Sequence, residues 1–315
     1  MIGTDVNIAI DNLNIGNLVA IPTETVYGLA ANGLNETAVL NIFRAKERPF
    51  FDPLILHVNS IEKVNDLVTE FDERLKKLAD AFWPGPLTLL LPKKDIVPDV
   101  VTSGLKQVAV RIPNHKLTLN LLEQLNFPLA APSANPFGYI SPTSAIHVEK
   151  QLGKKVSYIL DGGNCEIGLE SSIVGVEDNQ ICVYRLGGLS VEQIENVVGR
   201  VSLKINTSSN PKAPGQLKSH YAPNKPLYIG NLLALEQQNI TKKIICICFG
   251  NQPKFITDVK VLNLSKTNNV NEAAKNLFKF LREADELEGE IIITHLLPNT
   301  GLGAAINDRL KRAGA

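Results

Sequence analysis

Short apolar runs alternate with longer amphipathic stretches along the first 200 residues. Continuous apolar runs of strand length, typical of buried strands, occur at 18–22, 54–58 and 87–91. Stretches with apolar side chains at helical spacing, which indicate helices, occupy 36–47 and 61–82. The first of these helices must end near Arg48, because Pro49 follows and the residue before a proline avoids helical backbone angles. Lys46 and Arg48 are therefore expected at a helix end and in the loop after it.

The apolar strand predicted at 108–112 carries a single arginine, Arg111, on the face opposite its valines. A guanidinium buried in such a strand needs an anionic partner, because an unpaired buried charge is very costly. The partner is either a bound anion or a carboxylate of the chain, such as Glu24 or Glu170. The same two interpretations apply to Arg185.

The pattern changes after residue 200. Turn-forming residues dominate 201–224, which we interpret as a linker between domains. Beyond it, strand patterns are found at 227–229, 244–249, 259–264 and 290–296, and helix patterns at 270–287 and 303–313. This alternation predicts a small parallel α/β domain over 225–315, after a first α/β domain over 1–200.

Composition limits the classes of function. Apolar residues make up 44% and charged residues 20%, which is normal for a globular protein. Lys+Arg and Asp+Glu both number 32, so a broad electrostatic grip on nucleic acid is not expected. We see no signal peptide and no membrane-spanning run, and therefore expect a cytoplasmic protein. The four cysteines lack zinc-site spacing, and free thiols are the favoured interpretation.

Three local patterns carry candidate chemistry. Lys46 and Arg48 supply two cations beside a strand that contains His57, and Ser133-x-Asn135 forms a separate polar turn. A guanidinium grips phosphate or carboxylate with two prongs, and a lysine supplies a mobile point charge. Together they predict a site for a polyanion next to a small polar molecule. The alternative is that these residues have structural roles only. Lys46 would then be a favourable cation at a helix end, His57 a buried ring on the sheet, and Ser133 and Asn135 residues that shape a turn.

Ser141-Pro142 is typical of a helix start, with Ser141 as the N-cap. Helix N-termini also favour anions, so a cap and a ligand contact are compatible roles for Ser141.

Many ordered motifs resemble the YrdC/YciO family in its long two-domain form. They include Pro22-Thr-Glu-Thr-Val-Tyr-Gly-Leu29, Lys46-x-Arg48-Pro49, Pro53-Leu-Ile-x-His-Val58, Phe82-Trp-Pro-Gly-Pro-Leu-Thr88, Ala131-Pro-Ser-Ala-Asn135, Ser141-Pro-Thr143, Gly168-Leu-Glu-Ser171, Arg185-Leu-Gly187, His220-Tyr-Ala-Pro223 and Asp308-Arg309-Leu310. The resemblance implies a twisted, open mixed sheet around a concave cavity, plus a smaller Rossmann-like domain, with the linker folding back as a lid.

The resemblance also implies an activity, L-threonylcarbamoyladenylate synthesis by a nucleotidyltransferase. L-threonine, bicarbonate and ATP would give threonylcarbamoyl-AMP and pyrophosphate. Mg2+ would accompany ATP, with no organic cofactor and no metal ligands assigned. The product would pass to a transferase that modifies the adenosine next to the tRNA anticodon, with weak or no direct tRNA binding by this chain and no membrane.

Site residues follow from the resemblance position by position. The implied L-threonine site is Thr25, His57, Arg111, Ala131 and Ser171. The implied nucleotide site is Arg48, Asp52, Gln107, Ser133, Ser141, Arg185, His220 and Tyr221. The signature catalytic residues are Lys46, Arg48, Ser133 and Asn135. Asp52 stands where the family usually has asparagine, and its carboxylate would either repel phosphate or help to hold Mg2+.

Two other functions stay open. An RNA-binding module would use the same cationic hollow for a nucleic-acid backbone, although the near-zero net charge counts against it. A carbamoyl-transferring maturation factor shares the domain in other architectures, but no acylphosphatase-like or zinc-finger segment is present in this sequence.

Overall fold

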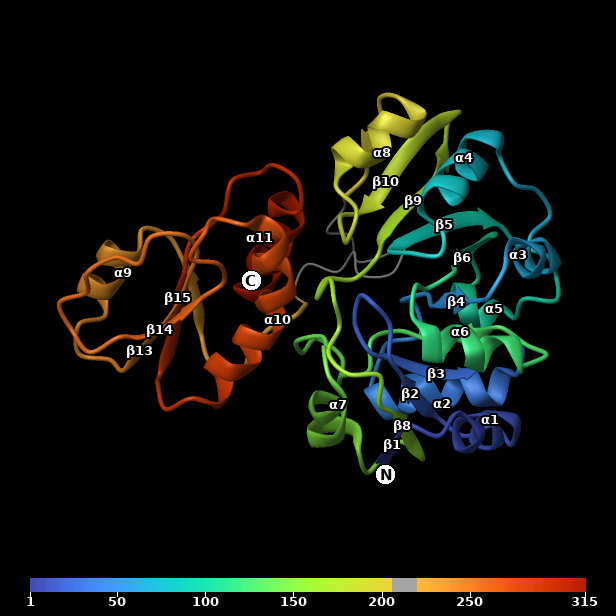
Figure 1. The fold of residues 1–315 in the computed structure, drawn as a ribbon, viewed down its shortest axis with the longest axis horizontal. Coiled ribbons are helices and arrows are strands. Elements are labelled where there is room, and N and C mark those ends of the chain that lie inside the picture. Colours follow the sequence, from blue (N-terminus) through green and yellow to red (C-terminus); the bar gives the residue numbers. More distant parts are fainter. Residues whose placement is uncertain (206–219) are drawn as a thin grey trace.

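Two sheets organise the chain, an 11-stranded mixed sheet followed by a 4-stranded parallel sheet (Figure 1). They belong to a computed structural model, which describes residues 1–205 and 220–315. The expected fold class, an open mixed sheet plus a smaller parallel α/β domain, is confirmed. Most of the predicted linker and lid, residues 206–219, lies outside the described residues.

The large sheet is mixed because β4 pairs in parallel with β6 and antiparallel with β7. Its strands are β1 (Ile2–Gly3), β2 (Val19–Ile21), β3 (Gly28–Asn32), β4 (Ile55–His57), β5 (Leu87–Pro92), β6 (Gln107–Arg111), β7 (Leu129–Ala130), β8 (Tyr158–Leu160), β9 (Ser172–Glu177), β10 (Gln180–Arg185) and β11 (Ser202–Leu203). Their spatial order is β1-β8-β2-β3-β7-β4-β6-β5-β9-β10-β11. The parallel register sets His57 beside Arg111, at the carboxyl ends of β4 and β6.

The helices of this domain are α1 (Val6–Asn14), α2 (Glu36–Lys46), α3 (Ile61–Leu67), α4 (Glu73–Phe82), α5 (Asp99–Thr102), α6 (Lys116–Glu123), α7 (Ala145–Leu152) and α8 (Val191–Val198). The predicted end of α2 is confirmed. Helix α2 stops at Lys46, and Glu47 takes a left-handed conformation with φ 56° that turns the chain towards Arg48.

Two expected helix features are wrong. The single helix at 61–82 is broken, because Val68 becomes extended and bridges to Lys93, after which Asp72 caps α4. The start of α7 is capped by Ser144 rather than Ser141. The Ser141 hydroxyl instead donates to Glu170 Oε1 at 2.6 Å.

The second domain matches its predicted alternation. Its strands are β12 (Leu227–Ile229), β13 (Ile244–Cys248), β14 (Lys260–Asn263) and β15 (Ile291–Thr294), all parallel, in the order β12-β15-β13-β14. Its helices are α9 (Leu232–Gln238), α10 (Val270–Glu286) and α11 (Gly303–Ala313). Figure 1 shows α10 and α11 on the side of the small sheet that faces the first domain.

The two domains share one apolar core. Buried side chains of both, among them Leu169, Tyr221 and Phe278, belong to a single continuous cluster. The backbones also approach closely at Gly168, which has φ +77° and where a Cβ would lie 2.7 Å from Ala274 O. Only glycine fits this contact without displacement, because the conformation and the space both exclude a side chain. The domains are therefore packed together rather than merely tethered.

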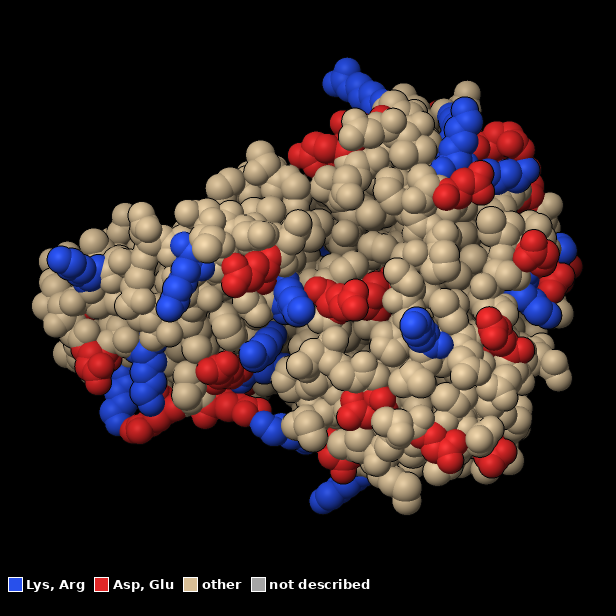
Figure 2. All heavy atoms as spheres, viewed as in Figure 1, with Lys and Arg blue, Asp and Glu red and all other residues tan. Residues whose placement is uncertain are grey.

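Charged side chains of both signs are mixed on the face of the molecule in Figure 2. Figure 2 shows Lys and Arg interspersed with Asp and Glu over both domains on this face. Within residues 1–205 and 220–315, no helix has the length and apolarity needed to cross a membrane. All four cysteines are free and buried, which confirms the expectation of free thiols.

Candidate functional site

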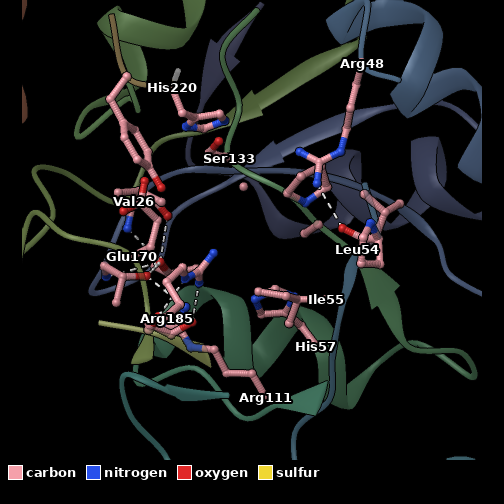
Figure 3. Close-up of a pocket in the computed structure, with 18 residues that line it drawn as sticks. Val26, Arg48, Leu54, Ile55, His57, Arg111, Ser133, Glu170, Arg185 and His220 are labelled. Atoms are coloured by element: carbon pink, nitrogen blue, oxygen red, sulfur yellow. Dashed lines mark hydrogen bonds between the residues drawn. The ribbon is translucent and has the colours of Figure 1, made fainter. Parts of the chain in front are cut away.

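Candidate residues from distant parts of the chain meet around one pocket in the first domain (Figure 3). The predicted residues that line it are Thr25, Arg48, His57, Arg111, Ala131, Ser133, Ser171, Arg185, His220 and Tyr221. Figure 3 shows the guanidinium groups of Arg48 and Arg185 and the rings of His57 and His220 around a common open space. Strand ends and the turns between them therefore assemble cations, hydroxyls and imidazoles at one place.

Arg111 is both ion-paired and exposed to the pocket. Its Nη2 lies 2.7 Å from Glu24 Oε1, Nη1 donates to Thr25 Oγ1 at 2.8 Å, and Nε donates to Gly85 O at 3.1 Å. A guanidinium has five N–H groups, so two remain for a ligand. The structural partner and the bound anion, which were alternatives at the level of sequence, are compatible in this geometry.

His57 is a buried neutral imidazole beside Arg111. Burial is the main cause that lowers the pKa of His57, to about 3, and the nearby Arg111 charge adds to it. Its Nδ1 has no hydrogen-bond partner among the described residues. An unpaired buried nitrogen that lines a pocket is suited to a polar ligand atom, because such a nitrogen is costly to leave unsatisfied.

Ser171 is held in place by its neighbours. Arg185 donates from Nε to Ser171 O and from Nη2 to Ser171 Oγ, each at 3.0 Å. The Ser171 hydroxyl also lies 2.7 Å from Thr88 Oγ1. Burial lowers the pKa of Arg185 to about 10, so the guanidinium stays charged at neutral pH. A fixed hydroxyl and a fixed cation thus face the pocket together.

Arg48 reaches the pocket with Asp52 behind it. Asp52 is fully buried, and its Oδ2 lies 2.9 Å from Arg48 Nη2. Arg48 also donates from Nε to Asp52 O and from Nη2 to Pro53 O. Asp52 itself is not among the described residues that line the pocket. Its placement fits a role in orienting Arg48 better than a direct ligand contact.

Lys46 and Asn135 support the turn that carries Ser133. Lys46 Nζ donates to Ser133 O and to Asn135 O, both at 2.5 Å. Asn135 Nδ2 donates to Pro136 O and Tyr139 O, both at 2.8 Å. Burial, and secondarily Arg48, lowers the pKa of Lys46 well below its ordinary value. Neither Lys46 nor Asn135 is among the described residues that line the pocket, so their contacts with the turn are what they bring to the site.

Gln107 is not brought to the pocket. It begins β6, whereas Arg111 ends the same strand, about 13 Å away at the usual rise per strand residue. It lines a separate hollow together with Glu70 and Asp72. Gln107 is close to Arg111 in sequence, but the extended strand between them places it at another part of the surface.

His220 and Tyr221 close one side of the pocket. The Tyr221 ring lies 4.1 Å from the His220 ring and 5.4 Å from the Phe278 ring of α10. The backbone N–H of His220 donates to the backbone carbonyl of Arg312 at 3.3 Å. Burial is the main cause that places the pKa of His220 well below its ordinary value, with Arg48 next. These two residues are therefore docked on the second domain while they face the site in the first.

Sequence reasoning assigned no role to Arg309, which is fully buried behind the pocket. Its Nε lies 2.9 Å from Glu170 Oε2, and Glu170 lines the pocket. A signal was present in the sequence. Arg309 follows Ile306 by three positions and precedes Leu310, so it lies on the apolar stripe of its helix. A charged residue on such a stripe indicates a buried, paired group.

Acidification is expected to destabilise the protein through histidines whose pKa values are lowered in the folded state. The pKa values of His57, His147 and His220 all lie below the ordinary 6.5, at about 3, about 4 and well below that value, with burial as the main cause. The unfolded chain therefore binds more protons below pH 6.5, and the free energy of unfolding falls as the pH falls. Each such group contributes at most about 1.4 kcal/mol per pH unit in this window.

Denaturant unfolding between about pH 8 and pH 5 measures this slope. His57→Gln should reduce it. A second comparison at pH 8, where the imidazole is neutral in both the folded and the unfolded chain, measures the effect of the altered packing alone. A slope that His57→Gln leaves unchanged would contradict the assignment.

Comparisons with known proteins agree with this geometry. A family model described as "Telomere recombination" matches residues 11–187, and one described as "Threonylcarbamoyl-AMP synthase, C-terminal domain" matches residues 189–315. The threonylcarbamoyl-AMP synthase of Pyrococcus abyssi is 40% identical over 98% of this chain and 93% of its own length. That of Bacillus subtilis is 38% identical over 96% and 90%.

Solved structures give the same result. The crystal structure of P. abyssi Sua5 complexed with L-threonine matches with a TM-score of 0.91 at 40% identity, over 98% of this chain and 94% of that one. E. coli YciO shares the fold of the first domain, with a TM-score of 0.53 at 21% identity. Both domains, in order and over nearly the whole chain, place this protein in the threonylcarbamoyl-AMP synthase family, in its Sua5-type two-domain form.

Proposed function

We propose that the pocket binds L-threonine and ATP side by side and joins them through bicarbonate, giving threonylcarbamoyl-AMP and pyrophosphate. The observation that carries this proposal is the shared cavity. Arg111 and His57 lie at one part of it, and Arg48 and Ser133 at another (Figure 3). Thr25 belongs with Arg111, to which its hydroxyl is hydrogen-bonded. Two anionic substrates and a carbonyl source then meet without any need for a covalent enzyme intermediate.

The L-threonine half is built on the ends of β4 and β6. The two free N–H groups of Arg111 bind the carboxylate with two prongs. The unpaired Nδ1 of His57 accepts a hydrogen bond from the substrate, and Ser171 supplies a fixed hydroxyl. Ala131 lines this half with a small apolar side chain. The L-threonine bound to the related P. abyssi protein supports the choice of amino acid.

The nucleotide half lies towards the second domain. Arg48 and Arg185 bind phosphate oxygens, and Lys46 fixes the turn that carries Ser133 next to them by donating to Ser133 O and Asn135 O. His220 and Tyr221 line this half with aromatic rings, which suits the nucleotide base. Ser141 contributes through Glu170, to which its hydroxyl donates.

Mg2+ enters as part of the ATP substrate. Glu170 is the only carboxylate among the described residues that line the pocket, and it is already bonded to Arg309 and Ser141. Residues 1–205 and 220–315 contain no group of three or more histidines, cysteines or carboxylates able to hold a metal ion. Phosphate oxygens and water are ligands that Mg2+ accepts readily, so the ion needs few protein ligands here.

The chemistry proceeds in two steps. The threonine amine attacks the carbon of bicarbonate or its dehydrated form, CO2, which gives a carbamate and releases water or a proton. A carbamate oxygen then attacks the α-phosphorus of ATP, the bond from that phosphorus to the bridging oxygen breaks, and pyrophosphate leaves. Fixed cations favour this step because they stabilise the charge that develops on the phosphoryl oxygens.

The activity is tested by pyrophosphate release from ATP, with L-threonine and bicarbonate each omitted in turn. The proposal expects release only when both are present. Release without L-threonine would point to a different adenylating activity and would overturn the substrate assignment.

The labile product is proposed to pass to a separate tRNA transferase in the cytoplasm. The near-zero net charge, and the mixed charge on the face in Figure 2, support weak or no direct tRNA binding by this chain, because tight binding needs clustered cations to displace counterions.

Salt separates the pocket from an RNA-binding surface. We expect KM for ATP to change only about twofold between low and physiological salt, since buried contacts are screened little. Any affinity for tRNA should be weak throughout. Submicromolar tRNA binding that falls steeply with salt would favour the RNA-binding alternative; it is measured by filter binding over a salt series.

A further inference from the structure

Two buried arginines of the second domain reach into the first. Arg282 on α10 is 4% exposed and Arg309 on α11 is 0% exposed. Both helices face the first domain (Figure 1). Burial of a guanidinium is costly unless its N–H groups are paired, so the partners of these side chains reveal what the interface is built to hold.

Arg309 holds elements on two sides of the pocket. Its Nε lies 2.9 Å from Glu170 Oε2, and its Nη2 donates to Leu186 O at 2.7 Å, just after β10. Its guanidinium also lies 5.0 Å from the centre of the Tyr221 ring, within cation–π distance. Asp308 completes the set at 2.6 Å from Nη1. Glu170 and Tyr221 both line the pocket.

Arg309 neutralises the charge of the buried Glu170 carboxylate. Glu170 is the only carboxylate among the described residues that line a pocket otherwise rich in cations, and it is 6% exposed. Left unpaired, it would repel the anionic groups of a substrate at short range in a medium of low dielectric constant. Burial raises the pKa of Glu170, but the charges of Arg309 and Arg185 outweigh burial, and the carboxylate stays ionised.

Arg282 holds the same region from the other side. It donates from Nε to Ser141 O at 3.2 Å, from Nη2 to Gln151 Oε1 at 3.0 Å, and from Nη2 to Ile140 O. The Ser141 backbone is thus fixed by α10, while its hydroxyl donates to the Glu170 carboxylate that Arg309 pairs with. The second domain therefore fixes a segment of the pocket wall from two helices.

We propose that Arg309 is a positioning residue through which the second domain completes the anion-binding half of the pocket. It neutralises Glu170, so that this carboxylate does not repel the substrate anion from the cationic side chains of the pocket, and its guanidinium packs against the Tyr221 ring. This inference rests on the assignment of that half of the pocket to ATP.

The test is a double-mutant cycle on the full chain. Arg309→Met should raise KM and the calorimetric dissociation constant for ATP by about 10- to 100-fold, because one partner of a buried charge pair is lost. The L-threonine KM should change much less. Arg309→Lys, which keeps the charge, should lie between. Lys311→Met, on the exposed face of the same helix, is the matched control and should behave as wild type.

Glu170→Gln provides the rescue. If Arg309 acts by neutralising Glu170, adding Glu170→Gln to Arg309→Met should bring the ATP KM to within about threefold of Glu170→Gln alone. The double variant also lacks the unpaired buried charge, so it should fold where the single variant is too unstable. An equally weak ATP KM in the double variant, or a wild-type ATP KM in folded Arg309→Met, would overturn the inference. Failure of the wild type to release pyrophosphate would instead overturn the proposed function.

Discussion

Replacement of Arg111 by lysine is expected to reduce kcat/KM for L-threonine by about 100- to 1,000-fold, because a point charge cannot replace the two-pronged contact with the carboxylate. Arg111 to alanine should do worse, since it also leaves Glu24 buried without its partner. The ATP KM should change far less. Initial rates of pyrophosphate release, measured against L-threonine at saturating ATP, give both constants.

Stability must be separated from binding in this experiment. Loss of a buried ion-pair partner costs about 3–5 kcal/mol, and Arg111→Ala is therefore measured together with the double variant Glu24→Gln/Arg111→Met. The double variant should regain much of the unfolding free energy while it remains unable to use L-threonine. An Arg111→Lys protein with an unchanged L-threonine KM would show that the carboxylate binds elsewhere.

Lys46→Met is expected to lower kcat by about 100-fold or more, because the Ser133–Asn135 turn loses the two hydrogen bonds that fix it. The Asn135 carbonyl loses its Lys46 donor in a buried position, which costs about 1–3 kcal/mol, so the unfolding temperature should fall as well. Turnover and thermal unfolding are measured on the same preparations. Lys94→Met is the matched control, since Lys94 also donates to a backbone carbonyl but lies at the surface.

The pattern of these effects identifies what Lys46 does. A fall in both stability and ATP affinity supports its role in holding the turn. Lys46→Met protein that is as stable as wild type, yet fails to bind ATP, would show that the ammonium acts on the phosphates directly and contributes little to the turn.

Features set by local sequence were predictable. The apolar runs located β4 and β6, and the proline rule placed the end of α2 near Arg48, within two residues of its observed end at Lys46. The register that sets His57 beside Arg111 followed only from the sheet pairing, although both residues were already named. The alternation after residue 225 was strong enough to locate every helix and strand it predicted.

Features decided by distant contacts were not predictable in the same way. The helix at 61–82 breaks because Val68 bridges to Lys93, a contact that local periodicity does not predict. Ser141 and Ser144 both have the chemistry of an N-cap, and the contact with Glu170 decides between them. The resemblance assigned Gln107 to the nucleotide site, but Gln107 begins β6 and therefore lies a strand's length away from the pocket.

The purpose of the second domain was likewise beyond sequence reasoning. An arginine on an apolar helical stripe indicates a buried ion pair. Its partner, Glu170, is known only once α11 is seen packed against the first domain. The same packing explains why His220 and Tyr221, which belong to the predicted linker and lid, are held at the pocket: the backbone of α11 contacts His220, and the Phe278 ring of α10 contacts Tyr221.

Isotopic labelling of the product tests the central claim most directly. The protein is incubated with ATP, L-threonine and isotopically labelled bicarbonate, and the adenylate formed is analysed at once by mass spectrometry. The account predicts an adenylate whose mass includes one threonine and one labelled carbon, formed together with pyrophosphate. An adenylate that contains threonine but no label, or an AMP that carries neither, would contradict it.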